Sequence, residues 1–495
     1  MNKKFSKILL IFICLFVFMM LFGCKKEIND EAITSNKVLV ERYSVSYYVD
    51  GELYWKKTYK VGAAIEQIEE PTKEGYTFKG WNKSLPKVMG KEDIVVSAVF
   101  EVNEYKITYV LNDEKYKEVK YNYGDTIENL KVSFDEDKYY FSGWSNVSKT
   151  MPANDIVVTG SLFDKENVNL IDLGDLKNSK KYDIIESGFY LVYGSNQNVG
   201  VNIVGSDLDV TLLFSDVDIK NNNLVPFEFN NNSVEIILLN DTDNSIVYTN
   251  KEVDKGCINT ENELSISGRG ILKLESSYQG IDVNGDINIS GCKVEIISQE
   301  EGIKTASNIN FQQASIDIDS LNCGLIGDSI KFDNCNIDIN SKKTGIKGND
   351  VVIDNSLVEI ISSTNSIECN NDLLIQNASL IVESNQIGLF TKEGSITIKQ
   401  GEITIISLWD AILSYNNIVI DDNPTITILS GGGLNGEFNY DEDGNVISCK
   451  GLYAYKNIVI DSGQILIESL DKCIISNGKL ELNGGLLNIK SKNGE

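Results

Sequence analysis

The sequence predicts an all-β protein in which a right-handed parallel β-helix follows two small β-sheet domains. Three observations support this prediction. Apolar residues recur at intervals of 21 to 23 residues from residue 266 onward, two similar units of about sixty residues precede them, and short strands bounded by Gly and Asn turns are the dominant pattern. A fixed period of short strands without long helices is typical of a β-solenoid.

The first residues carry an export signal. Three lysines precede the apolar run 8–22, and Gly23 and Cys24 follow it directly. Such a run is short for a membrane-spanning helix. The Gly-Cys pair resembles the lipobox of bacterial lipoproteins, which implies a signal peptide over 1–23, acylation of Cys24, and a lipid anchor at the outer face of the cell membrane. An ordinary signal or an uncleaved anchor is the alternative. Residues 24–41 are expected to form a polar tether.

Composition narrows the function classes. The formal net charge of -27 disfavours a nucleic-acid partner, because phosphate backbones would be repelled. Five prolines and 42% hydrophobic residues indicate an ordered chain. Of nine cysteines, two belong to the signal and the lipid site, which leaves an odd number. Their places in the repeat favour buried thiols over a disulfide framework.

Two copies of one unit occupy residues 42–102 and 103–164. Gly80-Trp81 corresponds to Gly143-Trp144, and Asp93 to Asp155, at offsets of 62 or 63 residues. Each unit begins and ends with an alternating run of aromatic and β-branched residues, the pattern of half-buried strands. The tryptophan of the Gly-Trp pair in each unit is favoured as a core anchor over a ligand platform.

The motif Lys-Glu-Gly-Tyr-Thr-Phe-Lys before the first Gly-Trp pair, with the closing Asp-Ile-Val-Val strand, resembles the internalin B-repeat or Listeria-Bacteroides repeat. This resemblance implies a β-grasp-like fold and a spacer or adhesive stalk that holds the next domain away from the membrane.

The β-helix is expected to span residues 165–495, with about ten regular rungs. Residues 165–255 show a weaker period and are expected to form irregular first rungs and a cap. One interval of 40 residues, between Ile420 and Ile460, predicts a loop that leaves the coil near 431–445. The register that defines the rungs consists of Ile266, Ile289, Phe311, Phe332, Ile353, Ile375, Ile398, Ile420, Ile460 and Leu482.

Two columns of residues follow the first strand of each rung. The first column is expected to stack amide side chains that hydrogen-bond from rung to rung. The second column, one residue later in each rung, consists only of small residues, which indicates a tight corner. The members of this first column include Gln313, Asn334, Asn355, Asn377, Gln400 and Asp422.

Catalysis is not the favoured interpretation. The chain has no histidine, which removes the commonest general base. Polysaccharide lyases of this architecture generally use Arg or Lys beside calcium, and the two arginines are Arg42 and Arg269, the latter in a tight turn. Hydrolases need a defined carboxylate pair, and no such pair stands out. A lyase is therefore the third-ranked function.

A column of outward carboxylates marks the second strand of four rungs. These residues alternate with apolar pairs, so they face solvent. Four like charges one rung apart repel each other, and a calcium ion with oxygen ligands would relieve the repulsion. A hydrated acidic face is the simpler alternative. The column consists of Glu295, Asp317, Asp338 and Glu359.

Residues 185–490 resemble the surface β-helix carbohydrate-binding domains of clostridial lipoproteins, on the basis of the segments 263–274 and 457–467 and of Gly-Ile turns such as Gly302-Ile303. That resemblance implies binding of an acidic polysaccharide such as polygalacturonate, with calcium. The family's acidic pair before the turn is present here at Glu300 and Glu301. A neutral sugar would instead require aromatic faces. The candidates for these are Trp409, Tyr415, Tyr453 and Tyr455.

The sequence thus predicts a surface lipoprotein that binds carbohydrate without catalysis. A surface adhesin or structural stalk with a protein partner is the second hypothesis, favoured if the two repeats rather than the helix make the contacts.

Overall fold

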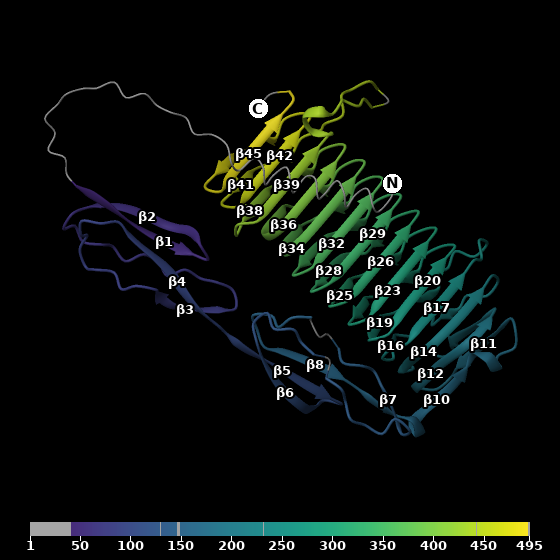
Figure 1. Ribbon diagram of the computed structural model, residues 1–495. Coiled ribbons are helices and arrows are strands. Elements are labelled where there is room, and N and C mark those ends of the chain that lie inside the picture. Colours follow the sequence, from purple (N-terminus) through teal and green to yellow (C-terminus); the bar gives the residue numbers. More distant parts are fainter. Residues whose placement is uncertain (1–40, 129, 146–148, 231, 442, 494–495) are drawn as a thin grey trace. The chain divides into compact units, whose positions relative to one another are not determined.

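The computed structural model describes residues 41–493, apart from 129, 146–148, 231 and 442 (Figure 1). The predicted signal peptide, Cys24 and nearly all of the tether lie outside this range. Within the described residues, no helix is long and apolar enough to cross a membrane. The chain divides into two compact units at residues 101/102, and each is described separately below.

The first unit contains one four-stranded sheet. Its strands are β1 (Arg42–Val49), β2 (Glu52–Lys60), β3 (Tyr76–Trp81) and β4 (Ile94–Val102), in the order β2-β1-β4-β3. Strands β1 and β2 form an antiparallel hairpin, whereas β4 runs parallel to β1. Asp50 and Gly51 both have positive φ, as a tight two-residue hairpin turn requires. Trp81 packs against Tyr47 in the core, with ring centroids 4.8 Å apart.

The second repeat has the same hairpin and parallel strand. Its sheet consists of β6 (Glu114–Asn122), β5 (Glu104–Leu111) and β8 (Ile156–Gly160), and β7 (Tyr139–Phe141) pairs with β9 (Leu162–Asp164). Trp144 is only 6% exposed, and its indole nitrogen donates a hydrogen bond to the Leu130 carbonyl at 2.7 Å. Both tryptophans therefore serve as core anchors, as the sequence predicts.

From β9 the chain continues through the 3-10 helix η1 (Lys165–Asn167) directly into a parallel β-helix. Most turns of this coil place two strands in a first sheet of 23 strands and one strand in a second sheet of 13 strands, and the neighbouring turns pair in parallel (Figure 1). The predicted fold class is confirmed.

The first sheet contains β10 (Val168–Asp172), β12 (Gly188–Gln197), β14 (Val210–Asn221), β16 (Val234–Leu238), β17 (Asp243–Tyr248), β19 (Leu264–Gly268), β20 (Ile271–Ser276), β22 (Ile287–Ser290), β23 (Lys293–Ser298), β25 (Ile309–Gln312), β26 (Ser315–Ser320), β28 (Ser329–Asp333), β29 (Asn336–Ser341), β31 (Asp350–Asp354), β32 (Leu357–Ser362), β34 (Leu373–Ser384), β36 (Ile396–Ser407), β38 (Ile418–Asp421), β39 (Thr425–Ser430), β41 (Ile458–Ile460), β42 (Gln464–Ser469), β44 (Leu480–Leu482) and β45 (Leu486–Ser491). The second sheet contains β11 (Lys180–Ile184), β13 (Val199–Ile203), β15 (Phe227–Glu228), β18 (Ile258–Thr260), β21 (Ile281–Val283), β24 (Ile303–Thr305), β27 (Leu325–Ile326), β30 (Ile346–Gly348), β33 (Ile367–Cys369), β35 (Leu389–Thr391), β37 (Ile412–Ser414), β40 (Leu452–Ala454) and β43 (Ile474–Ser476).

The coil has more turns than the ten regular rungs expected from the sequence. Residues 165–255 continue the same parallel ladders, because β10 pairs with β12 and β12 with β14. The apolar period is weak there because the length of a turn varies: paired residues are 21 positions apart between Val168 and Phe189 but 30 apart between Val234 and Leu264. When the number of residues per turn varies, the apolar residues are no longer evenly spaced in the sequence, but the strands of neighbouring turns still pair in parallel.

Inward side chains of successive turns stack on one another and form the core. Phe311 and Phe332 lie on neighbouring turns with ring centroids 5.2 Å apart and an interplanar angle of 2°. Both are 1% exposed, and Ile289 and Ile353 continue the same column above and below them. Burying each such side chain contributes roughly 1.5–3 kcal/mol.

The amide column at the corner is explained mainly by backbone conformation. Its members adopt the left-handed region, which Asn tolerates better than most residues. Among the described residues, one predicted bond along the axis is present, from Asn377 Nδ2 to Asn355 Oδ1 at 2.6 Å. The φ angles are +50° at Gln313, +54° at Asn334, +47° at Asn355, +53° at Asn377, +49° at Gln400 and +59° at Asp422.

The small column beside it is confirmed as a tight corner. A Cβ at Gly401 would collide with the backbone of Ala378 on the neighbouring turn. The seven described cysteines are all free and buried, as predicted. Burial raises the pKa of the Cys292 thiol to about 12, so this thiol stays protonated and unreactive.

The 40-residue interval contains the predicted excursion. Between β39 and β40 the chain leaves the coil, passes through the short 3-10 helix η3 (Gly433–Asn435), and returns after a bridge between Tyr440 and Val446. The coil then resumes in register, since β40 pairs directly with β37.

We expect Asn355→Val to destabilise the protein by about 1–2 kcal/mol, because a β-branched residue is strained at positive φ. Asn355→Gly should be close to neutral. The measurement is urea unfolding of the purified chain. Asn336→Val, at an exposed asparagine within strand β29, is the matched control and should have little effect. Equal losses for both valine variants would contradict the conformational explanation.

Candidate functional site

The outer face of the second sheet changes character along the coil. Residues at the centre of its strands stack in register, and most of them are partly exposed between two buried neighbours, whereas Asn259, Phe390 and Leu413 are themselves buried. Polar and charged side chains occupy this column in the first turns, and large apolar and aromatic ones occupy it in the last turns. In order, the column runs Asn202, Glu228, Asn259, Asp282, Lys304, Ile326, Lys347, Glu368, Phe390, Leu413, Tyr453 and Ile475.

Four aromatic rings gather at the later turns, and we call Phe390, Tyr415, Tyr453 and Tyr455 the aromatic platform. Ring centroids lie 5.4 Å apart for Phe390 and Tyr415, 4.6 Å for Tyr415 and Tyr455, and 5.1 Å for Tyr453 and Tyr455. Tyr415 is 44% exposed and Tyr455 is 47% exposed. Tyr415 and Tyr455 therefore offer ring surface to solvent on neighbouring turns of the coil, whereas Phe390 is buried, at 9% exposed, and packs against Tyr415.

Backbone pairing holds the two exposed tyrosines one above the other. Each follows directly after a strand of the second sheet, β37 or β40. The Tyr415 amide donates to the Thr391 carbonyl at 3.0 Å, and the Tyr455 amide donates to the Ser414 carbonyl at 2.9 Å. The same ladder that builds the coil thus fixes the spacing of the rings.

Polar groups border the platform. The Lys450 ammonium lies 4.6 Å from the Tyr453 ring centroid and 3.5 Å from an Asp471 carboxylate oxygen. The Asn477 amide donates to the Tyr453 hydroxyl at 3.4 Å. A hydrogen bond with Tyr453 raises the pKa of the Tyr455 hydroxyl. Rings edged by amide, hydroxyl, ammonium and carboxylate groups suit a ligand with both apolar faces and hydroxyls.

Asp410 supports this border from below the surface. It is 4% exposed, and its Oδ1 accepts hydrogen bonds from Ser448 Oγ at 2.6 Å and from the Lys450 amide at 2.7 Å. Burial raises the pKa of its carboxyl, although both hydrogen bonds and the charge of Lys450 oppose that shift. Asp410 thereby fixes the segment 448–450, where the chain re-enters the coil.

The structure brings together three of the four predicted aromatic residues. Tyr415, Tyr453 and Tyr455 join the platform, whereas the half-buried Trp409 lies in the turn before β37 and has no ring contact with them among the described residues. Phe390 was missed. The segments 388–390 and 451–453, Gly-Leu-Phe and Gly-Leu-Tyr, carry the signal that aligns Phe390 with Tyr453.

The predicted carboxylate column is present in register. Glu295 pairs with Asp317, Asp317 with Asp338, and Asp338 with Glu359, on β23, β26, β29 and β32. Glu295 also forms an ion pair with Lys293. Within the described part of the chain, no group of three or more Asp, Glu, Cys or His side chains is placed to hold a metal ion. A bound calcium ion at this column stays a prediction.

Glu300 and Glu301 lie at a different corner of the coil, where side-chain amides donate hydrogen bonds to their carboxylates. Asn322 Nδ2 donates to Glu300 Oε2 at 3.0 Å and to Glu301 Oε1 at 2.6 Å. Gln279 Nε2 donates to Glu301 Oε2 at 3.1 Å. Glu301 is 8% exposed. These amides hydrogen-bond to the buried Glu301 carboxylate, and calcium at this pair likewise stays a prediction.

We expect Asp410→Asn to be more stable than the wild type at neutral pH. A carboxyl with a raised pKa in the folded state contributes stability below its unfolded pKa of about 3.9, and this contribution is lost as pH rises through the folded value. Asparagine keeps an acceptor oxygen and never ionises. Urea unfolding near neutral pH and below about pH 4 measures the difference, which should vanish at the lower pH.

Asp441→Asn is the control for this pH dependence. Hydrogen bonds from Asn445 lower the pKa of the Asp441 carboxyl, so this variant should lose stability at neutral pH. A loss of stability in Asp410→Asn at neutral pH would instead mean that its attraction to Lys450 outweighs the cost of burial.

Comparison with known families covers most of the chain. A family model described as "Carbohydrate-binding domain-containing protein" matches residues 178–341 and 326–494. The Listeria-Bacteroides repeat domain matches residues 43–95 and 105–162. The first model spans the coil that carries the aromatic platform, and the second spans the two small sheet domains.

Two curated proteins are similar to part of the chain. Internalin H of Listeria monocytogenes is 32% identical over 159 residues, which are 28% of this chain and 28% of that protein. A putative membrane protein of Evansella cellulosilytica is 27% identical over 129 residues, 23% of this chain and 19% of its own length. The matches thus cover less than a third of either relative.

The family model of carbohydrate-binding domain-containing proteins covers more than half of the length of this chain. The chain therefore belongs to that family, and it carries two Listeria-Bacteroides repeats before its β-helix.

Proposed function

We propose that this protein is a lipid-anchored surface protein that binds polysaccharide on the aromatic platform without catalysing a reaction. The observation that carries the proposal is the row of exposed rings of Tyr415 and Tyr455, fixed on neighbouring turns and bordered by polar groups. The membership of the coil in a carbohydrate-binding family supports it.

The spacing of the coil suits an extended sugar chain. Neighbouring turns lie about 4.8 Å apart, so rings on successive turns can contact consecutive parts of one linear polymer that runs along the axis. The faces of sugar rings are apolar and their edges carry hydroxyls. Tyrosine rings can stack on those faces, while Lys450, Asp471 and Asn477 can hydrogen-bond to the hydroxyls.

The proposal also includes a lipid anchor and a location at the cell surface. The lipobox-like Gly23-Cys24 pair supports lipid attachment. The similarity of part of the chain to Internalin H supports display outside the cell. In this arrangement the two repeats serve as a spacer between membrane and coil. The lack of histidine supports a binding role without catalysis.

We expect Tyr415→Ala and Tyr455→Ala each to weaken retention of the full chain on an insoluble neutral glucan. The loss should be about two- to tenfold, since an aromatic contact contributes about 0.5–1.5 kcal/mol. Affinity electrophoresis or a pull-down with the glucan measures it. Tyr440→Ala, at a tyrosine 64% exposed in the loop, is the matched control and should bind normally. Equal retention of all three variants would contradict a role for the platform.

A second ligand class is favoured by the carboxylate column on the first sheet. Four outward carboxylates in register on consecutive turns of the coil can share divalent cations, and bridging calcium would let a strongly acidic protein bind an acidic polysaccharide such as polygalacturonate. This proposal therefore requires calcium, whereas stacking on the platform does not.

We expect retention on polygalacturonate to need calcium and to fall in the double variant Asp317→Asn/Asp338→Asn, even at saturating calcium. Binding is compared with added calcium and with a chelator. The charge-matched control is Glu114→Gln/Glu402→Gln, at exposed carboxylates outside the column. Retention that survives the chelator would remove calcium from the explanation.

If no glycan is retained by the intact chain, the adhesin hypothesis becomes the preferred explanation, in which the two repeats contact a protein partner.

A further inference from the structure

The second repeat packs firmly against the beginning of the coil. Strand β9 continues through η1 into β10 with no linker. The Asn240 amide donates to the Phe141 carbonyl at 3.5 Å. A separate apolar cluster closes this junction, made up of Tyr140, Phe163, Val168, Leu191, Tyr193, Leu213, Ile237 and Leu239.

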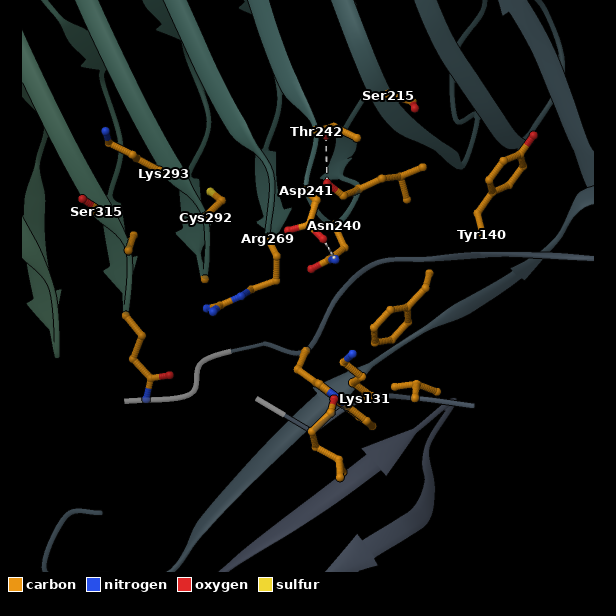
Figure 2. A pocket seen from close by; sticks show the side chains of 18 of the residues that line it. Lys131, Tyr140, Ser215, Asn240, Asp241, Thr242, Arg269, Cys292, Lys293 and Ser315 are labelled. Carbon is orange, nitrogen blue, oxygen red and sulfur yellow. Dashed lines mark hydrogen bonds between the residues drawn. The ribbon is translucent and has the colours of Figure 1, made fainter. Parts of the chain in front are cut away.

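A cleft of about 1160 Å³ lies beside this junction, between the second repeat and the corner of the first sheet (Figure 2). Figure 2 shows Arg269 and Lys293 on the coil and Lys131 on the repeat around this space. The cleft is lined by more cations than anions, although the chain as a whole has a net charge of -27. Its cations are Lys131, Lys149, Lys165, Arg269 and Lys293, and its carboxylates are Glu136 and Asp241.

Most of this positive charge is not neutralised by the protein. Of the five cations, Lys293 has an ion pair, with Glu295, whereas the other four have none with any described residue. Asp241 Oδ2 accepts a hydrogen bond from the Asn240 side chain at 2.6 Å rather than from Arg269. The Lys165 ammonium donates to the Glu136 carbonyl at 2.6 Å and lies 4.7 Å from the Tyr140 ring centroid.

Arg269 is fitted into the junction. It is half-buried, and a Cβ at Gly143 of the second repeat would collide with its Cβ and Cγ. Gly143 has a φ of +85°, which also favours glycine. The Arg269 guanidinium makes no hydrogen bond or ion pair with a described side chain. A guanidinium held in this way is prepared to bind an oxyanion through two parallel hydrogen bonds.

The remaining lining suits a sugar. Tyr140 offers a ring, and Asn240, Asn334 and Asn336 offer amides. The Gln313 Oε1 atom, also in the lining, is buried without a hydrogen-bond partner. Such an acceptor can receive a hydrogen bond from a ligand hydroxyl.

We propose that this junction cleft binds an anionic saccharide, with its carboxylate or phosphate group held by Arg269 together with Lys131 and Lys149. The anionic part of the proposal depends on the cleft alone, and the saccharide part rests on the proposed function. The site differs from the platform and from the carboxylate column in position, in charge and in its independence from calcium.

Titration calorimetry of the full chain tests the proposal, with a chelator present so that calcium bridges cannot contribute. The probes are trigalacturonate, glucose 6-phosphate and the neutral galactotriose. We expect one or both anionic probes to bind and the neutral one to bind much more weakly. Affinity should fall as salt is added, because ionic attraction is screened. Binding of one anionic probe alone identifies the anion as carboxylate or phosphate.

Arg269→Gln should weaken binding of the anionic probe by about tenfold or more, because it removes a charge-assisted pair of hydrogen bonds. Lys131→Gln/Lys149→Gln, which changes only the second repeat, should also weaken it. Lys331→Gln, at an exposed lysine outside the cleft, is the matched control. The proposal is overturned if no anionic probe binds, or if the cleft variants bind as tightly as the control. Tyr415→Ala/Tyr455→Ala should leave this binding intact, so failure of the platform and failure of the cleft are distinguishable.

Discussion

The structure depends on the parallel hydrogen-bond ladder between one turn of the coil and the next. Each turn must offer its backbone groups in register to its neighbours, since unpaired buried groups are costly. This register puts equivalent side chains directly above one another. It creates the inner stacks of Ile and Phe, the corner of left-handed Asn and Gln, and the outer columns from which the candidate sites are made.

The same ladder explains what could be predicted from the sequence. Where turn length is nearly constant, as from Ile266 to Ile420, spacing in sequence equals stacking in space. The sequence therefore predicts the register of the core and the alignment of the four carboxylates, while their role stays a prediction. Where turn length varies, as around β14, the period is lost although the ladder continues. The number of turns was underestimated for that reason.

The candidate sites were predicted only in part because they depend on relations across the ladder. The sequence singles out Tyr415, Tyr453 and Tyr455 because they lie near the inserted loop, but Phe390 lies 63 residues before Tyr453 in the sequence and is two turns away in the column. Trp409 also lies near the inserted loop in the sequence, but the structure places it in a turn apart from the other rings. The cleft could not be foreseen at all, because Arg269 meets Gly143 only through packing of a separate domain.

The alternation of inward and outward residues along each strand has a consequence for how such a protein can diversify. Inward positions are constrained by the turns above and below, whereas an outward position is constrained mainly by solubility and by its two neighbours in the column. A single outer column can therefore change during evolution, for example by exchange of the exposed Lys347 for a ring like that of Tyr453, while the fold is inherited unchanged. New ligand preferences can arise in this way by a few surface substitutions along a single line of the coil.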